Sequence, residues 1–339
     1  MSLTAALSVA RSGLNASSRA AELTSQNVAN ALTEGYGRRE LDLSSGMGGV
    51  SVIGVQRMAD RALIGDRRIA EAGSAASQSV ASFHTGLEKA IGTPGQAGSL
   101  GALVSGLETA LIDAAAQPQS DARLGAVVAA ADGLAGRVDG LSDHLQAARQ
   151  DADARIAGAV DQINAALKQI EALNGRITAD GSNGRDIGPM LDQRQVLVDG
   201  IAAHIPLREI DRGDGRIALV TKDGATLLDG RAATLRFERA GTITPEMTLA
   251  SGALSGLTLN GQPLAVSGIG GAGGGDLAAQ FDIRDRLAPE AQAALDGFAA
   301  DLATRFDGTA LFTPEAAENP WLLRDGPEAT APGPSGDAT

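Results

Sequence analysis

The chain has 339 residues, a formal net charge of −13 and no cysteine. This negative charge repels phosphate backbones and argues against nucleic-acid binding, and the lack of cysteine excludes disulfides, thiolate catalysis and cysteine-based metal sites. Hydrophobic residues make up 43% of the chain but aromatic residues only 2%, which favours slim, closely packed helices over a thick globular core.

The first predicted element is a helix over residues 3–28, ending near Asn30, with a narrow apolar stripe along one face. Positions on the stripe alternate steps of four and three, which is the spacing of a coiled-coil seam. A helix so weakly apolar is marginal alone, so we expect another helix to cover it. The alternative is an ordinary amphipathic helix packed on its own domain. The predicted assembly interface consists of Leu3, Leu7, Ala10, Leu14, Ala21 and Val28.

A loop with two glycines, residues 30–37, follows this helix. Alternating apolar residues then predict two short strands, within residues 39–43 and 50–55, around a glycine-rich turn. Four residues are expected to shape the turn that leads from the first helix into the rest of the chain: Asn27, Asn30, Gly35 and Tyr36.

Helical spacing predicts three further helices before residue 180. The first covers residues 59–91, and a shorter one runs from about residue 100 to Pro118. The third begins after Ser120 and continues for about 55 residues, which is roughly 80 Å at 1.5 Å per residue. Its seam contains one extra step of four, a stutter that locally unwinds a coiled coil without ending it. We interpret its scattered Asp, Glu and Arg residues as a solvated face.

A turn at residues 180–184 precedes a helix that starts at Pro189 and ends near His204. The apolar period then changes to two as far as residue 268, and helix resumes near Leu277 and again after Pro289. The predicted strands of the period-two region are 216–220, 227–228, 234–237, 247–249, 257–259 and 264–266.

The predicted fold class is therefore mainly α with a small β insertion (α+β), built as an elongated helical bundle around the long rod-like helix. Each part has its own composition and periodicity, which sets the expected boundaries. The expected parts are an N-terminal axial helix at 1–35, a helical domain at 36–204 and 276–312, a β insertion at 205–275 and a Pro/Gly-rich loop or disordered end at 313–339.

No motif in the chain predicts catalysis. Residues 268–273 match G-x-G-x-x-G but lack the βαβ context of a dinucleotide site, so a flexible hinge is the better interpretation. The three histidines, His84, His144 and His204, are far apart in sequence and belong to no catalytic or metal-binding motif. Residues 211–215 match a calcium loop only loosely and suit a hairpin turn. We expect no enzyme activity, cofactor or metal site.

The N-terminus also lacks the pattern of a cleaved signal peptide, because Arg11 and Arg19 interrupt the apolar positions. No run of about 18 apolar residues predicts a membrane span. We therefore expect no membrane insertion and, if the protein leaves the cell, export without a cleaved signal.

Three short N-terminal motifs, at residues 12–16, 27–31 and 35–39, resemble the signature of bacterial flagellar axial proteins, the group of rod, hook and hook-associated proteins. Later motifs narrow the resemblance to the hook-associated protein 1 (FlgK) family. They are Arg123 before the long helix and residues 162–164, 170–177, 191–194 and 281–285.

This resemblance implies a structural subunit of the bacterial flagellum at the hook–filament junction, located outside the cell and required for motility. It implies secretion by the flagellar type III apparatus, an export chaperone, and assembly as a ring-like homo-oligomer. Its neighbours would be the hook protein and a second junction protein or flagellin.

The family also has a C-terminal heptad helix that pairs with the N-terminal one. This chain ends near Pro332-Gly333-Pro334 without such a helix, so we expect a truncated member. Two alternatives remain open: a flagellar hook or rod protein, and an intracellular coiled-coil scaffold.

Overall fold

A computed structural model describes residues 3–46, 49–265 and 274–306. Its internal contacts divide the chain into two compact units, which are treated separately below. Unit 1 consists of the residues up to Ser79, Asp153–Ala240 and Leu249–Phe281, and unit 2 of Val80–Ala152, Gly241–Thr248 and the residues from Asp282 onward.

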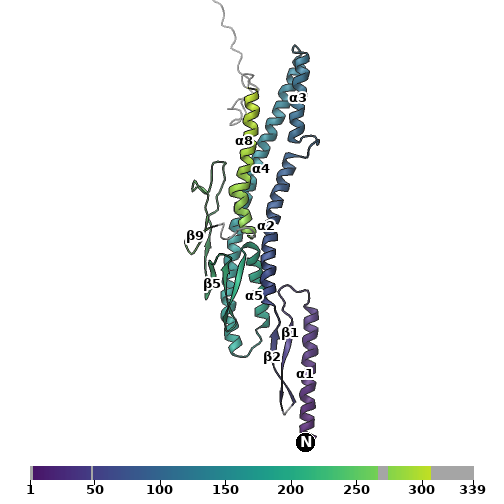
Figure 1. The fold of residues 1–339 in the computed structure, drawn as a ribbon, viewed down its shortest axis with the longest axis vertical. Helices are drawn as coiled ribbons and strands as arrows, with labels where there is room; N and C mark the ends of the chain where they lie inside the picture. The colour runs from purple at the N-terminus through teal and green to yellow at the C-terminus, as the bar shows by residue number, and fades with distance from the viewer. Residues whose placement is uncertain (1–2, 47–48, 266–273, 307–339) are drawn as a thin grey trace, which may run out of the picture. The chain divides into compact units, whose positions relative to one another are not determined.

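Helices form most of the described chain, and the strands are short and antiparallel, which confirms the predicted mainly α class with a small β insertion (Figure 1). A π-helical turn, Ile283–Leu287, joins the last two helices. The helices are α1 Leu3–Ala29, α2 Arg61–Ile91, α3 Leu100–Ala116, α4 Asp121–Ser182, α5 Gly188–His204, α7 Asp276–Asp282 and α8 Ala288–Arg305.

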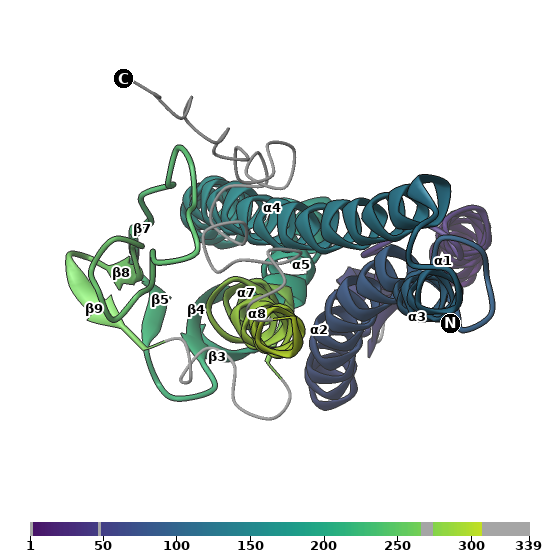
Figure 2. The same ribbon diagram turned by 90° about the horizontal axis from the view of Figure 1, so that it is seen from above.

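The strands form three small sheets, ordered β1-β2, β3-β4-β5-β6 and β7-β8-β9. Figure 2 shows the three-stranded sheet gathered beside β5, within unit 1. The strands are β1 Arg39–Gly46, β2 Gly49–Arg57, β3 Leu207–Gly213, β4 Arg216–Thr221, β5 Thr226–Asp229, β6 Arg231–Ala232, β7 Leu235–Arg236, β8 Leu257–Leu259 and β9 Gln262–Leu264.

The long helix α4 has 62 residues, compared with the predicted length of about 55. Its C-terminal end continues through Ser182, where a turn was expected, because the side chains of Ser182 and Asn183 hydrogen-bond back to the Ala179 carbonyl. The predicted seam is buried along most of its length. Its buried members are Val127, Ala131, Leu134, Leu141, Leu145, Ala152, Ile156, Ala159, Ile163, Ile170, Leu173 and Ile177.

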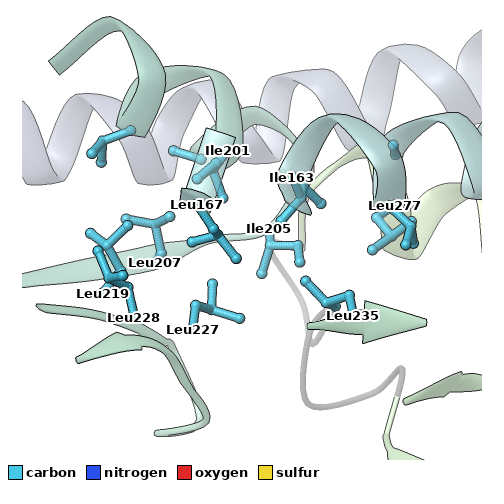
Figure 3. Packing of buried hydrophobic residues seen from close by; sticks show 14 of the residues in the cluster. Ile163, Leu167, Ile201, Ile205, Leu207, Leu219, Leu227, Leu228, Leu235 and Leu277 are labelled. Carbon is cyan, nitrogen blue, oxygen red and sulfur yellow. The ribbon is translucent and has the colours of Figure 1, made fainter. Parts of the chain in front are cut away.

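The core of unit 1 lies where the second half of α4, together with α5 and α7, meets the β strands. Figure 3 shows side chains from all these elements pointing toward one another. Burying each large aliphatic side chain contributes about 1.5–3 kcal/mol, so this cluster holds the small sheets on the helices. The labelled members are Ile163, Leu167, Ile201, Ile205, Leu207, Leu219, Leu227, Leu228, Leu235 and Leu277.

Polar side chains of α4 also bind the backbone of the β segment in unit 1. Asn164 donates to the Leu235 carbonyl and accepts from the Leu235 N–H, both at 2.9 Å. Asp153, only 1% exposed, accepts from the Ala240 N–H at 2.8 Å, and Glu171 accepts from another backbone N–H at 2.9 Å. The interpretation of the helix's charged residues as a solvated face is wrong at these positions, because their carboxylates accept from partly buried backbone groups of a strand and a loop.

In unit 2, α3 and α8 pack on the first half of α4 (Figures 1 and 2). Arg149, also expected on the solvated face, is buried, and burial lowers its pKa. It donates to the carbonyls of Arg284 (3.1 Å), Thr244 (3.0 Å) and Met247. These bonds hold residues 241–248 in a turn, so the strand predicted at 247–249 is wrong.

Two regions with sequence-based expectations, the glycine-rich match at 268–273 and the C-terminal part at 313–339, lie outside the described residues. Among the helices that are described, none combines the length and apolar character needed to cross a bilayer. Across residues 3–46, 49–265 and 274–306, no three His, Asp or Glu side chains group in a way that could hold a metal ion.

Candidate assembly site

Helix α1 packs against the β1–β2 hairpin through one face only (Figure 1). Ala16 and Leu23 are buried on this face. Ser12 extends the contact, since its hydroxyl accepts from the Val50 N–H at 3.1 Å and donates to the Val9 carbonyl at 2.9 Å. The hairpin therefore covers part of the helix and supports it within unit 1.

The predicted interface residues lie exposed on α1. Ala10 and Ala21 are exposed together with the four larger side chains. The four larger side chains would each gain about 1.5–3 kcal/mol from complete burial. The exposed fractions are 88% for Leu3, 71% for Leu7, 69% for Leu14 and 72% for Val28.

The turn after α1 is closed by Asn27. Its amide donates to the Arg39 carbonyl at 2.9 Å, and its side-chain oxygen accepts from the Arg39 N–H at 3.0 Å. The same oxygen accepts from the Tyr36 hydroxyl at 2.8 Å, and the Arg39 guanidinium lies 5.1 Å from the Tyr36 ring centre. Asn27 and Tyr36, both expected in the turn, are thus brought together around the first residue of β1.

The other two predicted turn residues act separately. Asn30 donates to the Gln26 carbonyl at 2.9 Å, which satisfies one of the free carbonyls at the end of α1. Gly35 has φ +75°, and a Cβ there would lie 2.4 Å from the Val196 side chain on α5. Only glycine fits both the backbone conformation and this close approach.

Asp192 on α5 anchors the turn and the hairpin. Its carboxylate accepts from Arg39 Nη2 at 2.8 Å, from Arg57 Nε at 2.7 Å and from the Gly37 N–H at 2.9 Å. Arg57 also donates to the Gly35 carbonyl at 3.2 Å and to the Gln195 side chain. The Asp192 side chain is only 15% exposed, so these charge-assisted bonds are partly shielded from water.

Sequence reasoning placed Asp192 in a family motif but did not connect it to the turn. The hairpin register, which the structure gives, accounts for its role, because Arg39 and Arg57 are direct partners in it. Like charges in that position destabilise a hairpin unless a carboxylate lies between them. Asp192, more than 130 residues further along the chain, supplies that carboxylate.

A cleft of about 570 Å³ lies beside this anchor in unit 1, between the start of α2, α5 and β3. Several of the charged side chains that line it pair with carboxylates of the same unit. Arg68 bonds to Asp199 at 2.5 Å and to Glu209 at 3.0 Å. Arg61 pairs with Asp211, which raises the pKa of Arg61 and lowers that of Asp211. This pairing is typical of a structural ion-pair network.

Comparison with known proteins matches most of the chain to one family. The family described as "Flagellar hook-associated protein FlgK helical domain" matches residues 85–309. Flagellar hook-associated protein 1 of Salmonella typhimurium (strain LT2) is 28% identical over 280 residues, covering 73% of this chain and 50% of the relative. The protein of the same name from Escherichia coli K12 is 25% identical over 236 residues, covering 66% and 43%.

Among solved structures, the flagellar hook junction protein FlgK from Burkholderia pseudomallei matches with a TM-score of 0.57. That match has 18% identity and covers 71% of this chain and 43% of the other, so it shows a shared fold. The chain spans about half the length of the curated relatives it matches.

Proposed function

The chain belongs to the flagellar hook-associated protein FlgK family, and from this membership we propose that it is a non-enzymatic structural subunit of the bacterial flagellum, acting at the junction of hook and filament. The relatives' names refer to the hook and to hook association. The whole-protein role is a proposal for this chain, which spans about half of those relatives.

The proposal assigns assembly to the exposed stripe of α1. Leu3, Leu7, Ala10, Leu14, Ala21 and Val28 would form a coiled-coil interface with a helix of a neighbouring flagellar subunit. The single observation that carries this assignment is the exposure of all six residues while the helix's other face packs on the hairpin. The turn at Asn27, Asn30, Gly35 and Tyr36 would fix the direction in which α1 leaves the rest of unit 1.

The remaining parts of the proposal follow from the family. Copies of the chain would assemble as a ring, next to the hook protein and to a second junction protein or flagellin. They would reach that position outside the cell through the flagellar type III route, with an export chaperone. The proposed parts are an assembly domain at 1–35, a helical domain at 36–204 and 276–312, and a β insertion at 205–275.

A double substitution tests the interface. Leu7→Asp with Leu14→Asp places two carboxylates on the stripe, and we expect incorporation into flagella to be lost while the circular-dichroism spectrum keeps its helical signal. Incorporation is measured by immunogold labelling of purified hook structures. The matched control is Ser8→Asp with Asn15→Asp, one residue off the stripe, which should incorporate normally. Normal incorporation of the Leu7/Leu14 variant would show that the stripe is no interface.

A further inference from the structure

The β segment between α5 and α7, whose residues 241–248 belong to unit 2, has a narrow neck within unit 1. It begins after His204, the last residue of α5, and ends before Asp276, the first residue of α7. The two ends touch at Gly275, where a Cβ would lie 2.3 Å from the His204 carbonyl oxygen. A glycine at this crossing lets the two backbones approach more closely than any side chain allows.

Side chains bridge the same neck. The Ser79 hydroxyl of α2 donates to Asp276 Oδ1 at 2.6 Å, and Gln280 donates to the same oxygen at 2.9 Å. The other carboxylate oxygen, Oδ2, lies 3.7 Å from Nδ1 of His204. The adjacent imidazole and these two donors lower the pKa of the Asp276 carboxyl to about 2, so it is charged at all physiological pH values.

The geometry suits a doubly protonated His204. Its Nε2 lies 3.3 Å from the side-chain oxygen of Gln162, which accepts a hydrogen bond from this nitrogen when Nε2 carries a proton. Nδ1 is buried, has no hydrogen-bond partner and faces the Asp276 carboxylate. In the neutral ring with its proton on Nε2, the lone pair of Nδ1 faces a negative charge, whereas in the cation both ring nitrogens face an acceptor.

The side chains that bond to this pair are uncharged. α2 contributes Ser79, α4 contributes Gln162 and α7 contributes Gln280. A groove of about 200 Å³ beside His204 is lined, apart from His204 and Gln162, by apolar residues of α4 and α5. Among the described residues that bond to His204 or line this groove, Asp276 is therefore the one that carries a negative charge.

We propose that His204 and Asp276 form a proton-operated clasp, which closes the neck of the β segment more tightly when His204 takes up a proton. Histidine side chains change charge between about pH 5 and 8, so the clasp responds to ordinary changes in the medium. At neutral to alkaline pH, Ser79, Gln280 and the core hold the neck. In mildly acidic medium an ion pair between His204 and Asp276, at the two ends of the β segment, is added. The unfolded chain does not have this ion pair.

A double-mutant cycle on the full chain tests the clasp. The wild type, His204→Gln, Asp276→Asn and the double variant are unfolded in urea at about pH 5 and about pH 8. The coupling factor is the ratio by which the unfolding constant of the double variant departs from the combined effects of the two single variants. We expect this factor to be about two to five at the lower pH and close to one at the higher pH. Coupling that is absent at both pH values, or equal at both, would overturn the clasp.

The other histidines give matched controls. His84→Gln and His144→Gln lie in unit 2, and neither should couple to Asp276→Asn at either pH.

A second readout applies if the His204 variant does not fold. The Ile205 N–H, bonded to the Ile201 carbonyl at 2.9 Å, reports on opening of the neck. Its protection from hydrogen exchange, corrected for the intrinsic rate, should rise about two- to fivefold from pH 8 to pH 5 in the wild type and stay constant in Asp276→Asn. A constant value in the wild type would contradict the proposal.

Discussion

Within unit 1, two kinds of residue connect α1 and the ends of the β segment to their neighbours: glycines at close approaches, and carboxylates that accept several hydrogen bonds. Gly35 has a positive φ and contacts Val196 on α5, while Gly275 lies against the His204 carbonyl. Asp192 accepts three hydrogen bonds from the turn and the hairpin, and Asp276 accepts one from Ser79 on α2 and one from Gln280 on its own helix. Substitutions at these positions should therefore cost more than their exposure suggests.

Gly35→Ala should destabilise the chain more than a substitution that introduces backbone strain alone. The matched control is Gly230→Ala, because both glycines have φ +75° but Gly230 has nothing within 4 Å of the added methyl group. We expect Gly230→Ala to cost about 1 kcal/mol of left-handed strain and Gly35→Ala about 1–2 kcal/mol more, measured by urea unfolding. Equal costs would mean that Val196 yields without penalty.

Acid should remove the contribution of Asp276. Its folded pKa of about 2 lies below the unfolded value of about 4, so the stabilisation is complete above pH 4 and is lost as pH falls to 2. With the side chain 26% exposed, we expect about 1–2 kcal/mol. The free-energy difference between the wild type and Asp276→Asn, from urea unfolding at each pH, should shrink over that interval. A difference that stays constant from pH 5 to 2 would contradict this assignment.

At the scale of elements, Asp192 ties the β1–β2 hairpin to α5. Asp192→Asn should leave Arg39 and Arg57 facing each other without a compensating charge, because the amide cannot neutralise two guanidinium groups. We expect a loss of about 2–4 kcal/mol in the free energy of unfolding, measured in urea. The control is Asp223→Asn, an exposed carboxylate, which should change stability by under about 0.5 kcal/mol. A similar loss of unfolding free energy in both variants would show that Asp192 does not anchor the hairpin.

The elements that could be predicted from the sequence are those with a regular local period. The prediction of the apolar seam of α4 is confirmed, because successive turns of that helix bury residues on the same face. Strand β3 was not identified because only Leu207 of its seven residues is buried, which leaves no alternation. The strand predicted at 247–249 is wrong, because the short run Met-Thr-Leu resembles a strand in sequence. Arg149, almost 100 positions earlier, holds the backbone there in a turn.

The candidate site was predictable to the same degree. Asn27 and Tyr36 lie nine residues apart and form a local turn, so their motif was visible. Asp192 and the His204–Asp276 pair depend on contacts between distant segments, and neither periodicity nor spacing reports such contacts.

At the scale of the whole molecule, each of the two units has its own buried clusters and its own buried arginine contacts, while the stripe of α1 stays exposed. An exposed row of leucines is unfavourable unless a partner covers it. The proposed place at the hook–filament junction would supply that partner. The central claim is therefore that the stripe is exposed in the free chain and buried after assembly.

Because the chain has no cysteine, a single introduced thiol can report on the stripe directly. Leu14→Cys should react readily with a maleimide in the free protein and at least about tenfold more slowly in assembled flagella. Asn15→Cys, one residue off the stripe, should react at nearly the same rate in both states. Equal reactivity of Leu14→Cys before and after assembly, in a variant that still incorporates, would contradict the account.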